Sequence, residues 1–181
     1  MTTQETTVLL VVDVQVGVMA SAWDAARIES NIATVVAKAR SAHVPIIWVQ
    51  HSDDGLKYGS DAWQIVPSLA PAATEPVVHK SHNSSFADTD LEQKLRELGT
   101  KRVVLAGAST NWCIRATAFS ALERGYDLTL VSDGHTTESL EFSDGKIIPA
   151  ESIVAEFTVG MKWISVPRVK VEVTKAEDLA F

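Results

Sequence analysis

The chain has 181 residues, of which 46% are hydrophobic and 22% are charged, and its formal net charge is −7 at pH 7. Length and composition are typical of one globular domain with a large core. The acidic balance, with acids and bases interleaved, argues against the basic surface that nucleic acids and anionic membranes require. No segment approaches the ~20 apolar residues of a membrane span. We expect one domain over residues 1–181 that binds neither nucleic acid nor membrane.

The cellular compartment is predicted from the cysteine content and from the start of the chain. Cys113 is the only cysteine, so no internal disulfide can form and a reducing, cytoplasmic location is expected. The first residues, MTTQETTVLLVVDVQ, lack the basic region and cleavage site of a signal peptide. We expect residues 1–6 to be frayed.

Strands and helices are predicted to alternate along the chain. Continuous apolar runs rich in β-branched residues predict buried strands at 7–12, 46–49, 76–79, 102–106 and 128–131, with a last strand at 161–165. Helical spacing and end signals predict helices at 25–42, 91–98 and 153–157. Another helix is predicted between the turn opened by Gly107 and Gly125, with Cys113 in its first turn.

End signals and loops complete this prediction. Thr89 and Glu92 match a capping box before the second helix, and Pro149 suits the first position of the last one. Residues 55–76 and 133–149 are predicted to be long loops, and long loops in a compact domain usually have a function. The tail, 166–181, is expected to pack at a subunit interface.

Alternating strands and helices predict an α/β fold, a parallel sheet with helices on both faces. In such sheets the ligand site lies beyond the carboxyl ends of the strands. Asp13 follows the first strand, Lys80 the third and Cys113 the fourth, so we expect these side chains to converge. The helix start around Cys113 favours a thiolate and predicts a lowered pKa for that thiol.

A carboxylate, an ammonium group and a thiol fit acyl transfer through a thioester. Asp13 serves as the base that takes the thiol proton of Cys113, and Lys80 holds the two groups in register. The backbone N–H groups of Ser109 and Cys113 are the expected oxyanion hole.

The sequence also resembles a known family. The run LLVVDVQ, the HK dipeptide followed by Phe86, and GASTNWCIRATAFSALERGYDLTLVSDGHTT are similar to the isochorismatase-like cysteine hydrolases, over residues 8–165. The resemblance implies a catalytic triad of Asp13, Lys80 and Cys113, and a non-proline cis peptide between Ala108 and Ser109. It also implies a three-layer α/β/α sandwich on a six-stranded parallel sheet, assembled as a homodimer or larger homo-oligomer.

The resemblance leaves more than one reaction open. The family includes nicotinamidases, amidohydrolases of N-carbamoylsarcosine, ureidoacrylate and biuret, and isochorismatase, which cleaves a vinyl ether. The retained Cys113 favours hydrolysis of a small amide, ureido or carbamoyl compound. Vinyl-ether hydrolysis, with Asp13 as the acid, stays an alternative, as does a non-catalytic, oligomeric or ligand-binding member of the fold.

No metal or other cofactor is expected. By the resemblance, nicotinamidases hold a metal with an Asp-x-His and further histidines after the second strand. Here Val49, Gln50 and His51 occupy that stretch, and the next histidine is His79. One histidine is not a metal site.

A pocket for a small-molecule substrate is expected at the mouth of this site. Its candidate lining residues are Gln15, His51, Trp63, Phe86 and Trp112. For each of them, core packing or bracing of a loop is an equally good interpretation. His135, in the GHTT turn, is expected to organise loop hydrogen bonds.

Overall fold

The computed structural model describes residues 6–181 as an α/β/α sandwich built on one six-stranded parallel sheet. The strand order is β3-β2-β1-β4-β5-β8, and every neighbouring pair is parallel. The six strands are β1 (Thr6–Val12), β2 (Ile46–His51), β3 (Val77–Lys80), β4 (Thr100–Ala108), β5 (Asp127–Thr136) and β8 (Val171–Thr174). The sheet with flanking helices confirms the predicted fold class.

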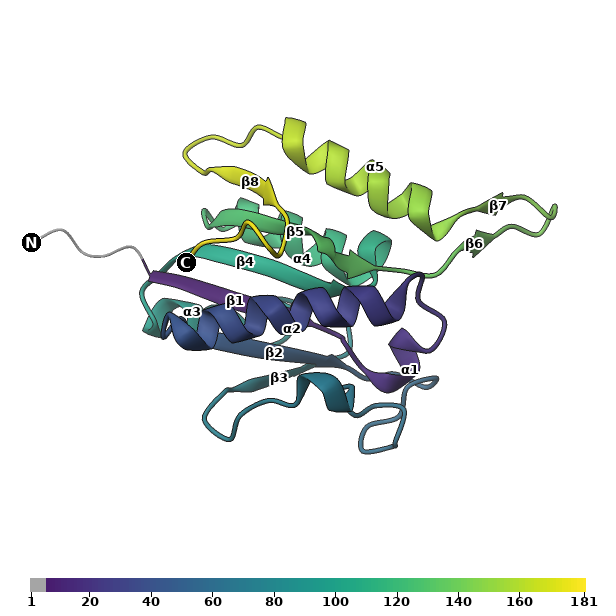
Figure 1. Cartoon of the computed structure of the whole chain (residues 1–181), viewed down its shortest axis with the longest axis horizontal. Coiled ribbons are helices and arrows are strands. Elements are labelled where there is room, and N and C mark those ends of the chain that lie inside the picture. The colour runs from purple at the N-terminus through teal and green to yellow at the C-terminus, as the bar shows by residue number, and fades with distance from the viewer. Residues whose placement is uncertain (1–5) are drawn as a thin grey trace, which may run out of the picture.

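Helices cover both faces of the sheet. The α-helices are α1 (Val16–Met19), α2 (Ala25–Ser41), α3 (Leu91–Glu97), α4 (Arg115–Glu123) and α5 (Ala150–Trp163). Figure 1 shows α2 in front of the sheet, with α3 and α4 behind it. Two short segments, the 3₁₀ turn η1 (Pro67–Leu69) and the π-helical turn η2 (Thr110–Ile114), complete the helical structure.

The two layers enclose separate apolar cores because successive strand residues face opposite sides of the sheet. On β1, Val8, Leu10 and Val12 pack into the core beneath α3, α4 and α5, while Leu9 and Val11 pack beneath α2. Burial on both faces explains why the strands are nearly continuous apolar runs in the sequence.

The prediction for the last helix was too short, and the predicted strand at 161–165 was wrong. Helix α5 runs on to Trp163, because Ile153, Phe157 and Met161 recur every four residues and all face the core. Pro149 is the residue that caps this helix and does not occupy its first turn.

The last strand of the sheet lies instead in the tail, where Val171 and Val173 alternate with Glu172 and pair with β5. Ala176 and Leu179 then pack into the core beneath α2, and Lys38 Nζ donates to their carbonyl oxygens at 2.9 and 3.0 Å. The tail therefore packs within its own chain, and a further role at a subunit interface stays a prediction.

Smaller differences concern segment ends. Thr6 belongs to β1, and residues 1–5 of the predicted frayed start lie outside the described residues. The capping box does not form: Asp90 is the residue at the start of α3, and Glu92 instead pairs with Arg96 and Arg124.

The loops predicted at 55–76 and 133–149 hold some regular structure. Residue Ile65 bridges to Gln15, and the second segment continues β5 before forming a hairpin of β6 (Leu140–Glu141) and β7 (Ile147–Ile148). This hairpin projects from the edge of the sheet at which the parallel strands end (Figure 1). In the part of the chain that the structure describes, no helix has the length and apolarity to cross a membrane.

Candidate active site

Asp13 lies immediately beyond β1, with its backbone in the left-handed region at φ 53°. Such a conformation is uncommon for a residue other than glycine and persists only where the surroundings enforce it. Here the Asp13 N–H donates to the Val49 carbonyl at 2.9 Å, and the side chain is buried. The neighbouring strand β4 approaches closely at Gly107, where a Cβ atom would lie 2.0 Å from the Val12 carbonyl oxygen.

Lys80 ends β3, and its ammonium group is the centre of the site. Its Nζ lies 2.6 Å from Asp13 Oδ2, 3.1 Å from the His82 carbonyl oxygen, 3.2 Å from His51 Nδ1 and 3.3 Å from Cys113 Sγ. The structure thus brings together Asp13, Lys80 and Cys113, three residues from distant parts of the sequence. A cation in contact with both a carboxylate and a sulfur can stabilise a negative charge on either group.

Cys113 lies in η2, between β4 and α4, and is partly exposed. The peptide bond between Ala108 and Ser109, directly before this turn, is cis. The Ser109 carbonyl accepts hydrogen bonds from the N–H groups of Trp112 and Ile114, both at 3.1 Å. Single π-helical turns occur frequently at functional sites. The oxyanion hole of the Ser109 and Cys113 N–H groups stays a prediction.

Burial raises the pKa of the Asp13 carboxyl above its ordinary value, with Lys80 opposing the rise. Lys80 is at ion-pair distance, yet neither Asp13 oxygen has a partner in hydrogen-bond geometry among the described residues. A buried carboxylate held mainly by charge has free lone pairs and gains from taking up a proton. Asp13 therefore has the properties of a base.

The prediction of a lowered thiol pKa was wrong. Burial, and next the negative charge of Asp13, raise the pKa of Cys113 to about 12. The start of η2 does not compensate for these effects, because desolvation penalises the thiolate directly. As long as Asp13 carries its negative charge, the Cys113 thiol therefore keeps its proton at neutral pH. Moving that proton to Asp13 removes the charge that repels the thiolate and leaves the total charge of the site unchanged.

Two of the candidate pocket residues brace the site. The Gln15 side chain is buried; its Nε2 donates to the carbonyls of His51 and Trp63 at 3.0 and 2.7 Å, and its Oε1 accepts from the His51 N–H at 2.8 Å. With these three contacts it fixes the end of β2 to the loop at 55–66. The His51 ring lies beside Lys80, so it joins the site directly.

The structure does not bring Trp63 and Phe86 to the triad. The Trp63 ring lies beside His79 and Tyr58, with ring centroids 5.3 and 4.5 Å apart, and His79 points to the face of the sheet opposite to Lys80. Phe86 is buried near the far end of α4, stacked on Tyr126 with Arg124 over its ring. Trp112 is half-exposed next to Cys113, where it can border a pocket.

Other residues that hold the nucleophile segment come from the end of β5. Thr110 Oγ1 lies 2.9 Å from His135 Nδ1, and Thr137 Oγ1 donates to Asn111 Oδ1 at 2.6 Å. The interpretation of His135 as an organiser of hydrogen bonds agrees with this geometry. The GHTT motif was the available signal, whereas Thr110 and Asn111 gave none because their partners are distant in sequence.

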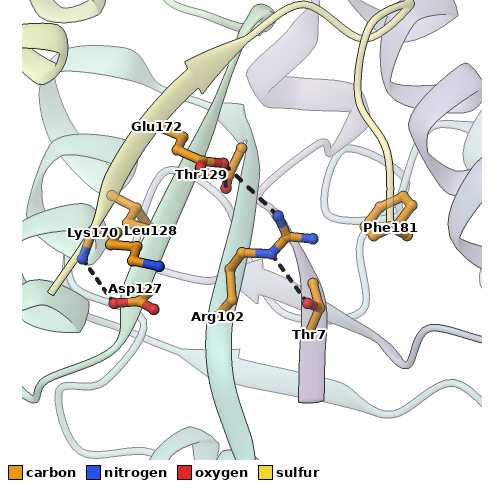
Figure 2. A pocket seen from close by; sticks show the side chains of 8 residues that line it. All are labelled: Thr7, Arg102, Asp127, Leu128, Thr129, Lys170, Glu172 and Phe181. Atoms are coloured by element: carbon orange, nitrogen blue, oxygen red, sulfur yellow. Dashed lines mark hydrogen bonds and ion pairs between the residues drawn. The ribbon is translucent and has the colours of Figure 1, made fainter. Parts of the chain in front are cut away.

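Across residues 6–181, no three His, Cys, Asp or Glu side chains are grouped so that they can hold a metal ion. The absence of a metal or cofactor requirement stays a prediction. A separate cavity of about 300 Å³ lies at the amino end of the strands, away from the triad (Figure 2). Arg102 in this cavity contacts Thr7 and Glu172, and the backbone N–H of Lys170 donates to Asp127.

Fold and site together define an α/β protein with an aspartate, a lysine and a cysteine clustered at the carboxyl edge of a parallel sheet. The family model of the isochorismatase domain matches residues 7–158. The chain therefore belongs to the isochorismatase family, as its motifs predicted, and is a hydrolase of that family.

Individual relatives agree with this assignment. YddQ of Bacillus subtilis, an uncharacterized isochorismatase family protein, is 33% identical over 169 residues, which cover 88% of this chain and 93% of that protein. A streptothricin hydrolase of Streptomyces noursei is 32% identical over 172 residues, covering 88% of this chain but 62% of its own. A crystal structure from Oleispira antarctica, described as an isochorismatase hydrolase, matches with a TM-score of 0.86 and 30% identity over 98% of this chain and 97% of its own.

Two further relatives carry the names of amide-cleaving enzymes. Nicotinamidase 3 of Arabidopsis thaliana is 26% identical over 136 residues, covering 66% of this chain and 69% of its own. The maleamate amidohydrolase of Pseudomonas putida is 41% identical over 66 residues, covering 36% of this chain and 31% of its own.

Proposed function

We propose that this protein is a cysteine hydrolase that cleaves the C–N bond of a small amide, ureido or carbamoyl compound through a thioester on Cys113. The observation that carries the proposal is the position of Lys80 Nζ, which lies 2.6 Å from the Asp13 carboxylate and 3.3 Å from the Cys113 sulfur. Base, nucleophile and a cation that stabilises either anion thus share one site.

In the first half of the reaction, the Asp13 carboxylate takes the proton of the Cys113 thiol. The sulfur forms a bond to the carbonyl carbon, and the oxyanion is received by the backbone N–H groups at Ser109 and Cys113. Asp13 then gives its proton to the leaving nitrogen, the C–N bond breaks, and ammonia or an amine departs. Lys80 keeps the negative charge stabilised while it moves from carboxylate to sulfur and back.

In the second half, Asp13 takes a proton from water, and the resulting hydroxide adds to the thioester carbonyl. The C–S bond breaks, the acid product leaves, and Cys113 regains its proton from Asp13. The same carboxylate therefore acts as base and as acid in both halves, which suits a group whose pKa is raised by burial.

Two sets of observations support amide chemistry over the alternatives. The thiol is present and in contact with its partners, whereas vinyl-ether hydrolysis with Asp13 as acid needs no thiol. Relatives with the names nicotinamidase and maleamate amidohydrolase match this chain. A small-molecule substrate, a cytoplasmic location and a homo-oligomeric assembly stay predictions.

The test is an ammonia-release screen over small amides, ureides and carbamoyl compounds, with wild type and Cys113→Ala in parallel. The wild type is expected to release ammonia and to form an acyl adduct that intact-mass spectrometry detects, and the variant to do neither while keeping its circular dichroism spectrum. Full turnover by Cys113→Ala would contradict the proposal. A vinyl-ether substrate cleaved by Cys113→Ala but not by Asp13→Ala would establish the alternative reaction.

A further inference from the structure

The ammonium group of Lys80 has one side-chain contact that the proposed reaction does not use. The group has four neighbours. Asp13, its ion-pair partner, and Cys113 belong to the reaction, and the His82 carbonyl is a backbone group. The fourth is Nδ1 of His51, at 3.2 Å. The strand register explains the contact, because His51 and Lys80 are paired residues on β2 and β3 and their side chains share one face of the sheet.

The contact fixes which nitrogen of His51 carries the proton. A lysine ammonium group can only donate, so Nδ1 must present its lone pair to Lys80. In neutral imidazole the proton then resides on Nε2. That nitrogen lies 3.0 Å from Asp53 Oδ2, which accepts it. The result is a directed chain of hydrogen bonds from Lys80 to His51 to Asp53.

Asp53 is itself held in place as an acceptor. Its Oδ1 accepts the N–H groups of Gly55 and Leu56, both at 2.8 Å, which leaves Oδ2 for the histidine. The N–H of Leu56 and the His51 ring keep the pKa of the Asp53 carboxyl below its ordinary value, so the group stays a carboxylate. The His51 backbone is fixed on its other side by Gln15.

From this geometry we propose that His51 is a positioning residue: its Nδ1 lone pair, fixed by the Asp53 carboxylate, holds the Lys80 ammonium group in register with Asp13 and Cys113. The inference deepens the proposed function and rests on it. It gives His51 and Asp53, which lie outside the triad, a role in the site. It also explains why a histidine is accommodated beside a cation, because the ring presents a lone pair to Lys80.

The test measures the rate at which iodoacetamide alkylates Cys113, together with kcat and KM where a substrate is found. Because the chain holds one cysteine, the incorporated mass reports this thiol alone. His51→Leu removes the acceptor, and Lys80 is then free to leave the sulfur. We expect alkylation at pH 7.5 to slow by about 10- to 100-fold, the effect of one hydrogen bond to a charged group, and kcat to fall with KM little changed.

His51→Asn is the matched variant, since its side-chain oxygen occupies the position of Nδ1. Its Cys113 is expected to be alkylated about tenfold faster than in His51→Leu, the effect of one such hydrogen bond at its lower limit.

Asp53→Asn tests the proton position with the histidine retained. Its amide oxygen must face the N–H groups of Gly55 and Leu56, so its NH₂ faces Nε2 and forces the proton onto Nδ1, against Lys80. Alkylation should slow as in His51→Leu.

His79→Leu is the control, because this exposed histidine points away from Lys80 and should leave alkylation unchanged. Equal rates for His51→Asn and His51→Leu, or a wild-type rate in Asp53→Asn, would overturn the inference. If His51→Leu fails to fold, the alkylation rates of Asp53→Asn and His51→Asn are compared instead. Slower alkylation in Asp53→Asn supports the inference, and equal rates overturn it. Iodoacetamide needs no substrate, so the expected alkylation pattern in a protein that cleaves no C–N bond would refute the proposed function alone.

Discussion

Lys80 Nζ and Asp13 Oδ2 form an ion pair at 2.6 Å between two side chains that are almost completely removed from solvent. A buried pair of this kind is costly to break, because loss of one partner leaves an uncompensated charge in the interior. The same pair sets the charge of the candidate site. Stability and chemistry are therefore coupled at these two residues.

The first prediction concerns this pair. Lys80→Met is expected to lower the free energy of unfolding by about 3–5 kcal/mol, the usual effect of removing one partner of a buried pair. The double variant Asp13→Asn with Lys80→Met has no buried charge and should recover most of that loss. Urea unfolding of the wild type, the two single variants and the double variant measures it. A double variant as unstable as the sum of the two single variants would show that the pair is not the cause.

The second prediction concerns the close approach of β1 and β4 at Gly107. This residue has φ 130°, and an added Cβ would meet the backbone of Val12, which cannot give way. Gly107→Ala is therefore expected to cost more than about 4 kcal/mol, in the range of severe lesions, or to prevent folding. Gly125→Ala is the matched control: its φ is 84° but its surroundings are open. It should cost about 1–2 kcal/mol, the left-handed penalty alone.

The sheet and the convergence of Asp13, Lys80 and Cys113 could be predicted because they follow from strand order along the chain. Each residue directly follows or ends a buried apolar run, and parallel strands deliver their carboxyl ends to one edge. The last strand could not be predicted in the same way. Val171 and Val173 alternate on an edge strand that is half-exposed, which gives a weaker signal than the continuous run of a central strand.

The surroundings of the triad were harder to predict than the triad itself. The raised pKa of Cys113 depends on how deeply the thiol is buried, and sequence position gives no measure of burial. The contact of His51 with Lys80 depends on the register of β2 against β3, which a one-residue shift would abolish. Trp63 was misplaced for a similar reason, since a loop residue can reach either face of the sheet.

The third prediction concerns the pH dependence of stability. Burial lowers the pKa of His135 from 6.5 to about 4. Between pH 6.5 and pH 4, His135 binds a proton in the unfolded chain but not in the folded chain. The contribution of His135 to the free energy of unfolding is therefore complete above pH 6.5 and is lost as the pH falls towards 4. The slope is about 1.4 kcal/mol per pH unit for one proton.

Urea unfolding between pH 7 and pH 4 measures this effect, and His135→Asn is the comparison because its side chain has no proton to gain. The difference in unfolding free energy between wild type and His135→Asn should shrink or reverse as the pH falls. A difference independent of pH would show that His135 titrates normally in the folded protein.

The fourth prediction concerns the C-terminal tail. Lys38 on α2 donates to the carbonyls of Ala176 and Leu179, which joins a helix to a segment well over a hundred residues further on. Lys38→Met keeps an unbranched side chain only one atom shorter and removes the N–H donors. The tail beyond β8 should then open more often, because each hydrogen bond from a charged donor contributes about 1.5–3 kcal/mol.

Hydrogen exchange followed by mass spectrometry measures this opening, with faster exchange expected for peptides that cover 175–181 and unchanged exchange for peptides that cover β1. Lys175→Met is the control, because the Lys175 side chain is mostly exposed and its ion pair with Glu177, at 3.8 Å, lies on the surface. Unchanged exchange in Lys38→Met would mean that the packing of Ala176 and Leu179 under α2 holds the tail without help from the lysine.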